Sequence, residues 1–287
     1  MHILITGSKG QLGSSIKELS KEFNNFKYFF TDKDPLDISN LQLVEKFVND
    51  NRIDVIINCA GYTNVDGAEN AFKLANKINH KAVKNLGLIS KKNKIKLIHI
   101  STDYVFKGNS EIPYLETDVT MPKNNYGVSK LKGEKALLEL NPKNCVIIRT
   151  SWMYSLYGEN FMKTMLSLFK ENESINVVSD QIGSPTNALD LGRVILGIIP
   201  KIDNKDVEVY HYSNKGMCSW YQFSKEILKN TNETCIINPV SSKMYKSKAK
   251  RPKFSILDTR KIEDTFSIQI PKWEVSLSKC LKKINSI

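Results

Sequence analysis

Two pairs of residues in this sequence have the types and the spacing that proton-transfer chemistry requires. Tyr126 and Lys130 lie four residues apart in "NNYGVSKLKGEKALLEL", and Tyr221 and Lys225 lie four apart in "YQFSK". A lysine one helical turn from a tyrosine supplies a positive charge that lowers the pKa of the phenol from its usual value of about 10. With 11 Tyr and 42 Lys and Arg in the chain, at least one such pair is expected by chance. Spacing alone therefore does not identify a functional pair.

The elements that surround each pair are the next source of information. Over about the first 150 residues, short apolar runs alternate with longer helical patterns, and the strand candidates are nearly all apolar, as in a parallel sheet that helices cover on both faces. We expect a Rossmann-like, doubly wound α/β domain over residues 1–151 and a smaller substrate-binding lobe over residues 152–287, with segments near 185–213 returning to the main sheet. The expected strands of the first domain are "HILIT", "KYFFT", "DVIINC", "KLIHIS" and "CVIIRT", and one long helix, "AENAFKLANKINHKAVKNLGLISKKN", is expected between the third and the fourth. The expected elements of the lobe are helices near 158–170, 187–199, 219–230 and 274–285 and strands at "INVV" and "VEVYHYS".

A glycine-rich turn follows the first expected strand. Gly7, Gly10 and Gly13 lie in "TGSKGQLG", between that strand and a helix. The first glycine allows a tight turn, the second lets the backbone approach a pyrophosphate, and the third permits close helix packing, while the helix N-terminus attracts phosphates. This position predicts a dinucleotide site.

Polar residues after the second expected strand bear on the choice of cofactor. Asp32 lies about twenty residues past the glycines, where a carboxylate can bond the adenosine ribose and favours NADH. Lys33 beside it can instead meet the extra phosphate of NADPH, so NADPH and NADH both stay open. Asp37 and Ile38 can line the adenine, although an Asp that caps the helix beginning near Leu41 is a comparable interpretation.

The third and fourth expected strands end in small or polar residues at the same edge of the sheet. The third ends in "NCAGYT", which includes Gly61, Tyr62 and Thr63, and the fourth ends in "HISTDYVFKG", which includes Thr102 and Asp103. Backbone must pass close to a ligand at this edge. Taken alone, Thr102 is as well explained by a turn as by catalysis.

Context separates the two Tyr/Lys pairs. Tyr126 lies 24 residues after Thr102, at the start of the helix that follows the fourth strand. One helical turn then carries Tyr126 and Lys130 on one face toward the cofactor crevice. Tyr221 follows no such strand and has no comparable hydroxyl upstream. We therefore assign the chemistry to the first pair.

The composition is that of a soluble globular protein, with 41% apolar and 25% charged residues. The net charge of +12 is spread along the chain, and the densest cluster, "SSKMYKSKAKRPKF", lacks interleaved base-stacking aromatics. We expect a lysine-rich surface that attracts a phosphorylated small substrate, and no nucleic-acid partner.

Nothing in the sequence indicates a membrane or a metal. No apolar run approaches the roughly 20 residues that span a bilayer, and "MHILITG" enters a strand without a basic leader. We expect a cytoplasmic protein with no membrane partner. The cysteines are scattered without metal-ligand spacing and are expected to be reduced thiols; they lie at positions 59, 145, 218, 235 and 280.

The combination of TGxxGxxG with Thr102, Tyr126 and Lys130 resembles the extended short-chain dehydrogenase/reductase superfamily. Within it, residues 3 to about 275 look closely similar to the dTDP-4-dehydrorhamnose reductase family. The motifs that carry this likeness are "STDYVFKG", "YGVSK", "RTSWMY", "GENF", "VVSDQIGSPT" and "RPKFSILDT".

The resemblance implies NAD(P)H-dependent reduction of the C4 ketone of a dTDP-linked 4-keto-6-deoxy sugar, the last step of dTDP-L-rhamnose synthesis for cell-surface polysaccharide such as the O-antigen of lipopolysaccharide. It implies a monomer or a homodimer. It implies that Tyr126 is the general acid, that Lys130 also holds the nicotinamide ribose, and that Thr102, Asp103 and Trp152 meet the sugar. The cofactor-binding residues that it implies are the backbone of Gly10, Gln11 and Leu12, with Asp32, Asp37, Ile38, Gly61, Tyr62 and Thr63.

Two positions depart from the family pattern. Phe254 stands where the family usually has Asn, which affects a polar contact to the nucleotide. Ser15 stands where some relatives have an acidic ligand for a magnesium ion between subunits, so no metal is predicted.

Alternatives remain at single residues and for the whole protein. Trp152 either packs on the sugar or seals the seam between the lobes, and Arg149 either meets the diphosphate or forms a structural ion pair.

A reductase of another nucleotide-linked 4-keto-6-deoxyhexose is the nearest alternative function. A non-catalytic regulatory subunit with the same fold, such as that of methionine adenosyltransferase, is another, although it does not require the Tyr/Lys pair. A dehydratase is disfavoured because Asp103 is followed by Tyr104 and not by a second acid.

Overall fold

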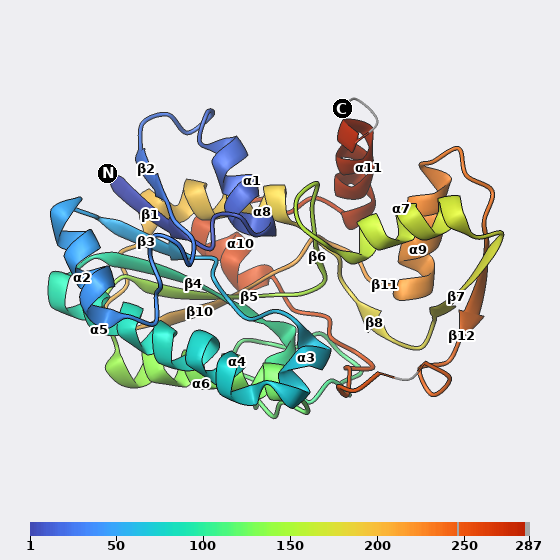
Figure 1. The fold of residues 1–287 in the computed structure, drawn as a ribbon, viewed down its shortest axis with the longest axis horizontal. Helices are drawn as coiled ribbons and strands as arrows, with labels where there is room; N and C mark the ends of the chain where they lie inside the picture. The colour runs from blue at the N-terminus through green and yellow to red at the C-terminus, as the bar shows by residue number, and fades with distance from the viewer. Residues whose placement is uncertain (246, 285–287) are drawn as a thin grey trace.

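A six-stranded parallel sheet forms the centre of the computed structural model, which describes residues 1–245 and 247–284 (Figure 1). The strand order is β10-β5-β4-β3-β1-β2, and every neighbouring pair is parallel. The strands are β1 (His2–Thr6), β2 (Lys27–Phe30), β3 (Val55–Asn58), β4 (Lys96–Thr102), β5 (Cys145–Thr150) and β10 (Glu208–Tyr212). The order reverses at β1, which lies between β2 and β3, and ligands bind at the carboxyl edge beside such a reversal. The predicted doubly wound fold is confirmed.

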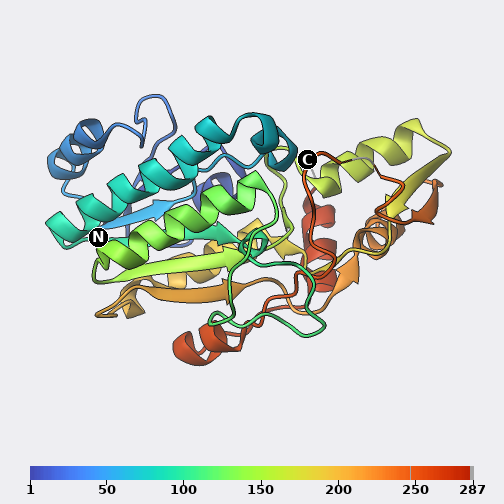
Figure 2. The same ribbon diagram turned by 90° about the horizontal axis from the view of Figure 1, so that it is seen from below.

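Both faces of the sheet are covered by helices, which explains why the strands are mostly apolar on both sides. On one face, Ile3, Ile5 and Ile57 pack with α1 (Gln11–Leu19), α8 (Ala188–Ile198) and α10 (Arg260–Phe266). On the other face, Leu4, Ile56 and Leu97 pack with α2 (Leu41–Asp50), α5 (Val83–Asn93) and α6 (Asn125–Leu140), and Figure 2 shows α5 and α6 side by side over the strands. Successive strand residues point to opposite faces, so a strand covered on both sides buries all of them.

One predicted helix is interrupted. The segment "AENAFKLANKINHKAVKNLGLISKKN" contains the end of α3 (Val65–Asn70) and all of α5, with α4 (Phe72–Asn76) and a π-helical turn (Lys77–Ala82) between them. The backbone leaves the helical region at Ala71, which separates α3 from α4. At the π-turn, α6 approaches so closely that a Cβ on Gly133 would lie 2.2 Å from the carbonyl oxygen of Asn79. The prediction of one continuous helix was wrong because this distortion depends on a partner helix that the local pattern does not reveal.

A second lobe lies beside the carboxyl edge of the sheet (Figure 1). Its apolar core includes Tyr154, Met162, Phe223, Trp273 and Leu277. Its elements are β6 (Met153–Tyr154), α7 (Phe161–Glu171), β7 (Ser174–Val178), β8 (Ile182–Gly183), β9 (Thr186–Asn187), β11 (Cys218–Ser219), α9 (Trp220–Lys229), β12 (Ile236–Val240) and α11 (Trp273–Ile284).

The predicted elements of the lobe lie within a few residues of the observed ones, except that position 285, the predicted end of the last helix, is outside the described residues. The chain does return to the main sheet through α8 and β10, and it returns again through α10, which was not predicted. The boundary between residues 151 and 152 stays a prediction. In the described part of the chain, no helix has the length and apolarity to cross a membrane.

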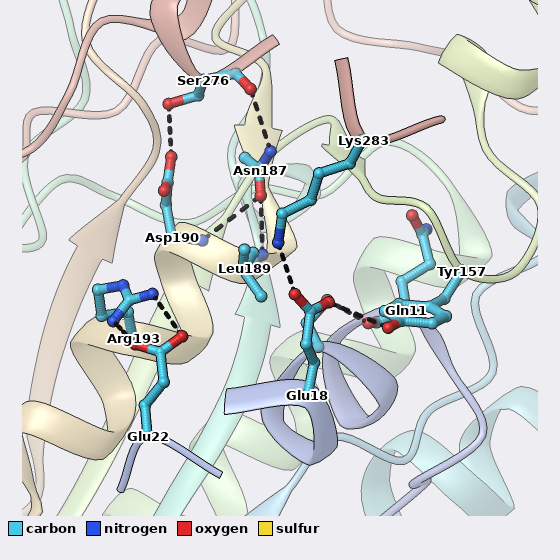
Figure 3. Close-up of polar contacts among 11 residues, drawn as sticks. Gln11, Glu18, Glu22, Tyr157, Asn187, Leu189, Asp190, Arg193, Ser276 and Lys283 are labelled. Carbon is cyan, nitrogen blue, oxygen red and sulfur yellow. Dashed lines mark hydrogen bonds and ion pairs between the residues drawn. The ribbon is translucent and has the colours of Figure 1, made fainter. Parts of the chain in front are cut away.

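Polar contacts fasten the second lobe to α1 and α8 (Figure 3). The Glu18 carboxylate of α1 accepts a hydrogen bond from the Tyr157 hydroxyl at 3.0 Å and pairs with Lys283 of α11 at 2.6 Å. Asp190 of α8 accepts a hydrogen bond from the Ser276 hydroxyl at 2.5 Å. These contacts fix the lobe against the domain that carries the glycine-rich turn.

Candidate active site

A cavity of about 1100 Å³ opens at the carboxyl edge of the sheet, between the two lobes. Fifteen of the predicted site residues line it, and Gly13 and Tyr62 do not. The lining residues are Gly7, Gly10, Gln11, Leu12, Asp32, Lys33, Asp37, Ile38, Gly61, Thr63, Thr102, Asp103, Tyr126, Lys130 and Trp152. The structure therefore brings the three predicted groups of residues to one space, while their individual roles stay predictions.

The glycine-rich turn forms one end of the cavity. Gly7 has φ +63°, and a Cβ there would lie 2.7 Å from the backbone of Ala60. A Cβ on Gly13 would lie 2.4 Å from the carbonyl oxygen of Gly7, so Gly13 serves the packing of α1 and does not face the cavity. Gly10 precedes the first turn of α1 and no side chain caps that helix end. The N–H groups of the first turn of α1 can therefore donate hydrogen bonds to an anionic ligand.

Asp32 binds the backbone of the same turn. Its carboxylate accepts hydrogen bonds from the N–H of Lys9 at 3.1 Å and from the N–H of Lys33 at 2.9 Å. A carboxylate has about four acceptor positions, so Asp32 can hold the turn and still accept a bond from a ligand. The Lys33 side chain is exposed at the cavity rim.

The alternative interpretation of Asp37 as a helix cap was wrong. Asn40 caps α2, because its side chain accepts a hydrogen bond from the N–H of Leu43 at 3.0 Å. The Asp37 carboxylate accepts a hydrogen bond from the N–H of Ser39 at 2.8 Å, and hydrogen bonding with Ser39 lowers the pKa of Asp37. Asp37 therefore shapes the turn before α2, beside Ile38 at the cavity wall.

Asn79, in the π-turn, was not predicted as a site residue. Its side-chain oxygen accepts a hydrogen bond from the N–H of Tyr62 at 2.8 Å, and its amide donates to the Tyr62 carbonyl at 3.0 Å and to the Ser129 hydroxyl at 2.9 Å. Asn79 thus fixes the segment around Gly61 at the cavity wall and links it to α6 one residue before Lys130. An Asn within an otherwise helical pattern is the only sequence signal for this role.

Thr102 and Asp103 lie at the end of β4. The Thr102 hydroxyl donates to Asp103 Oδ1 at 3.0 Å and accepts from the N–H of Tyr104 at 3.2 Å. Asp103 is 2% exposed, and its Oδ2 is buried. Burial raises the pKa of Asp103 to about 6, and hydrogen bonding with Ser255 and Thr102 opposes that rise. Asp103 lines the cavity beside Thr102, so its carboxyl group is placed at the wall where a ligand would bind.

Tyr126 is the second residue of α6, whose N-terminus is capped by Asn124. Its ring meets that of Tyr104 edge to face, with centroids 5.6 Å apart. Burial raises the pKa of Tyr126 to about 12, and a hydrogen bond with Thr102 opposes that rise. This direction is opposite to the lowering expected from Lys130, because removal of the hydroxyl from water outweighs the other influences. The phenol is protonated at neutral pH, which is the form that donates a proton.

Lys130 is 5% exposed, and its Nζ donates to the carbonyl oxygen of Ile100 at 2.5 Å. Burial lowers the pKa of Lys130 to about 8, and the negative charge of Glu134 opposes that change. The ammonium form therefore predominates at neutral pH and is lost as the pH rises through about 8.

The second pair has no comparable setting. Tyr221 and Lys225 lie on α9, and Lys225 Nζ is 5.6 Å from the centre of the Tyr221 ring. Lys225 is exposed, and neither residue lines the 1100 Å³ cavity. This pair makes a surface cation–π contact.

Trp152 lies where the chain leaves β5 for the second lobe, with φ 45°. One face of its ring stacks on Trp220 with centroids 3.5 Å apart, and a Cβ on Gly183 would lie 2.3 Å from the ring. Trp152 is nonetheless partly exposed and lines the cavity. The ring therefore packs against the second lobe and also presents surface to the cavity. Trp220, which fixes its orientation, has no signal in the sequence.

Three further positions are explained by packing. Arg149 is 4% exposed and forms a buried ion pair with Glu134 at 2.8 Å, which favours the structural interpretation over a diphosphate contact. Phe254 packs against the apolar cluster that includes Phe106 and Tyr114. Ser15 is buried and donates to the carbonyl oxygen of Gln11 at 2.9 Å. Among the described residues, no group of three or more His, Cys, Asp or Glu side chains is arranged to hold a metal ion.

Comparisons with known proteins agree with this geometry. The family model described as "RmlD substrate binding domain" matches residues 1–286. A dTDP-4-dehydrorhamnose reductase of Aggregatibacter actinomycetemcomitans is 38% identical over 284 residues, which cover 96% of each chain. A crystal structure of a dTDP-4-dehydrorhamnose reductase from Clostridium acetobutylicum has a TM-score of 0.94 and 39% identity, covering 99% of this chain and 100% of that one. One from Bacillus anthracis, in complex with NADP, has a TM-score of 0.93 and 40% identity, covering 98% and 99%.

Proposed function

Since this chain belongs to the dTDP-4-dehydrorhamnose reductase family, we propose that it reduces the C4 ketone of dTDP-4-dehydro-L-rhamnose to give dTDP-L-rhamnose, with NADPH or NADH as the reductant. The observation that carries this proposal is the meeting of Thr102, Tyr126 and Lys130 at a cavity whose other end is the glycine-rich turn. The product sugar serves cell-surface polysaccharide synthesis, and its nucleotide-linked form and NAD(P)H are cytoplasmic metabolites. A cytoplasmic location is part of the proposal, and the protein acts as a monomer or a homodimer.

The residues at the glycine-rich end fit a dinucleotide. Gly7 has the positive φ that the turn requires, Gly10 places no side chain at the cavity wall, and the uncapped N-terminus of α1 favours a pyrophosphate. Asp32 would accept a bond from the adenosine ribose hydroxyls, and Lys33 would meet the additional phosphate of NADPH. The presence of both side chains supports the use of either cofactor. Lys130 would hold the nicotinamide ribose at the other end.

The chemistry of the cofactor is the delivery of hydride to C4. The protein supplies the proton and the stabilisation of charge. The Tyr126 hydroxyl, protonated at neutral pH, donates its proton to the oxygen on C4 as negative charge develops there. Thr102 donates a hydrogen bond to the same oxygen after its hydroxyl turns away from Asp103. The Lys130 ammonium stabilises the phenolate that remains on Tyr126.

The second end of the cavity fits the sugar. The Asp103 carboxyl group at the cavity wall accepts a hydrogen bond from a sugar hydroxyl, and the open part of the Trp152 ring packs on the apolar face of a deoxysugar. Both groups are fixed before the sugar binds, Asp103 by Thr102 and Trp152 by Trp220. Such preorganisation lowers the entropy lost on binding.

The identity of the nucleotide is tested by offering the purified protein the dTDP-linked 4-keto sugar and, separately, its UDP and GDP counterparts. The expected result is oxidation of NADPH and NADH, followed by absorbance, with the dTDP sugar preferred over the other two. A preference for UDP or GDP would replace this proposal with a reductase of another nucleotide-linked 4-keto-6-deoxyhexose. Binding of cofactor without oxidation in all three cases would favour a non-catalytic protein.

A further inference from the structure

A fully buried carboxylate lies one helical turn beyond Lys130. Glu134 is 0% exposed and lies on the face of α6 that covers β4 and β5. A carboxylate in such a place is expensive to bury unless its charge is paired and hydrogen-bonded. Positions i and i+4 of a helix are neighbours, so Glu134 lies on the same side of α6 as Lys130. The mechanism described above assigns no role to Glu134.

The Glu134 carboxylate is rigidly held from two strands. Arg149 of β5 donates from Nε to Oε1 at 3.0 Å and from Nη2 to Oε2 at 2.8 Å, which is a bidentate pair. Ser101 of β4 donates its hydroxyl to Oε1 at 2.5 Å. Ser101 also lines the cavity. The contacts therefore connect the interior carboxylate to the cavity wall.

Arg149 is in turn fixed by its own surroundings. Its guanidinium lies over the Phe106 ring, 5.0 Å from the centroid, and donates to the carbonyl oxygen of Glu116 at 3.2 Å. His211 lies 3.4 Å away, and burial lowers its pKa to about 3, so that side chain is neutral. The buried cluster thus contains one anion, Glu134, and two cations, Arg149 and Lys130.

The other groups of β3, β4 and α6 that face Lys130 carry no negative charge at neutral pH. Asp103, whose pKa is about 6, is largely ionised there but acts on Tyr126 and not on Lys130. From β3, the Cys59 thiol has its pKa raised to about 12 by burial. From β4, His99 has its pKa held well below its usual value by burial, and Ile100 contributes a carbonyl oxygen. From α6 itself, Tyr126 is protonated. Among the described groups that act on Lys130, Glu134 is the one that favours its charged form at neutral pH.

We propose that Glu134 is a positioning residue whose carboxylate, fixed by Arg149 and Ser101 one helical turn from Lys130, keeps the Lys130 side chain protonated. The inference rests on the proposed function, because it assumes that Lys130 must be a cation to hold cofactor and to stabilise the Tyr126 phenolate. A purely structural ion pair between Glu134 and Arg149 would affect folding stability and leave the titration of Lys130 unchanged.

The first test is the pH dependence of kcat/KM for NADPH, because this parameter reports the groups of the free protein. In the unchanged protein, the rate constant is expected to fall as the pH rises through about 8, where Lys130 loses its proton. Glu134→Gln removes the charge that favours the ammonium, so the fall moves to lower pH by roughly one unit, the lower end of the shifts that a nearby opposite charge produces. Glu134→Asp keeps the charge and retains the original profile. Glu139→Gln, at an exposed position of the same helix, is the matched control and leaves the profile unchanged.

A second variant separates this effect from loss of folding, because Glu134→Gln leaves the Arg149 charge buried without a partner. The double variant Glu134→Gln with Arg149→Met removes both charges, and its folding is checked by circular dichroism and thermal melting. The fall of kcat/KM is still expected at lower pH than in the unchanged protein. A profile identical to that of the unchanged protein, in either variant, overturns the proposal.

The affinity for NADPH, followed by cofactor fluorescence over the same pH range, gives a readout that does not require turnover. The same shift to lower pH is expected in the Glu134→Gln binding curve. If the unchanged protein binds NADPH but oxidises none with the sugar nucleotide, the proposed function fails while the binding curves still test Glu134. If the protein is active and the binding curves of the two proteins coincide, only the role of Glu134 is lost.

Discussion

Tyr126→Phe is expected to lower the rate of ketone reduction by roughly a hundredfold or more, which is the usual contribution of a general acid. The substitution removes one oxygen and leaves the ring, so the edge-to-face contact with Tyr104 is preserved. Folding and NADPH binding should therefore be nearly unchanged. The measurement is the single-turnover rate of NADPH oxidation at saturating sugar nucleotide, with cofactor affinity measured separately.

Tyr221→Phe is the matched control for this experiment, because Tyr221 also precedes a lysine by four residues but lies on α9, away from the cavity. Turnover is expected to stay within a few-fold of the unchanged protein. Near-normal turnover of Tyr126→Phe, or a severe loss in Tyr221→Phe, would show that the wrong pair has been assigned.

Lys130→Met is expected to lower both the reduction rate and the affinity for cofactor. The substitution removes the charge that stabilises the Tyr126 phenolate and the ammonium that binds the Ile100 carbonyl and the nicotinamide ribose. Methionine has a similar length and tolerates a buried position, so the loss is electrostatic in origin. A charge whose removal shifts a neighbouring pKa by one unit accounts for about a tenfold change, so losses of roughly tenfold or more are expected in each parameter.

The readouts for Lys130→Met are kcat at saturating cofactor and the dissociation constant of NADPH from fluorescence. Lys225→Met, on the exposed face of α9, controls for the loss of one lysine from a strongly basic chain and should change neither. A Lys130→Met protein with lower affinity but an unchanged kcat would restrict Lys130 to cofactor binding.

The sheet and the location of the cavity were predictable from the sequence because both depend on local patterns. Strands with apolar residues on both faces, such as Val55–Asn58, indicate helices on two faces, and a glycine-rich turn after the first strand marks the carboxyl edge. The distance in sequence from Thr102 to Tyr126 then places a hydroxyl and a phenol at the same edge. These features need no knowledge of which distant segments meet.

The features that were missed depend on contacts between distant segments. Asn79 can fix the segment around Gly61 because α6 packs closely against the π-turn. Trp220 can orient Trp152 because α9 lies beside the end of β5. The pairing of Glu134 with Arg149 joins α6 to β5. The predicted lowering of the Tyr126 pKa was wrong for a similar reason. Burial by the surrounding segments raises this pKa, and that effect outweighs the lowering expected from a positive charge on the same helix.

The transfer of deuterium tests the central claim most directly. NADPH that carries two deuterium atoms at C4 of its nicotinamide is incubated with the protein and dTDP-4-dehydro-L-rhamnose, and the product is analysed by mass spectrometry and NMR. A product that contains one deuterium, bound to C4 of the sugar, is expected if hydride is delivered to the ketone at the site of Thr102, Tyr126 and Lys130. Recovery of unlabelled sugar with unoxidised cofactor, or of deuterium at any other carbon, would contradict the account.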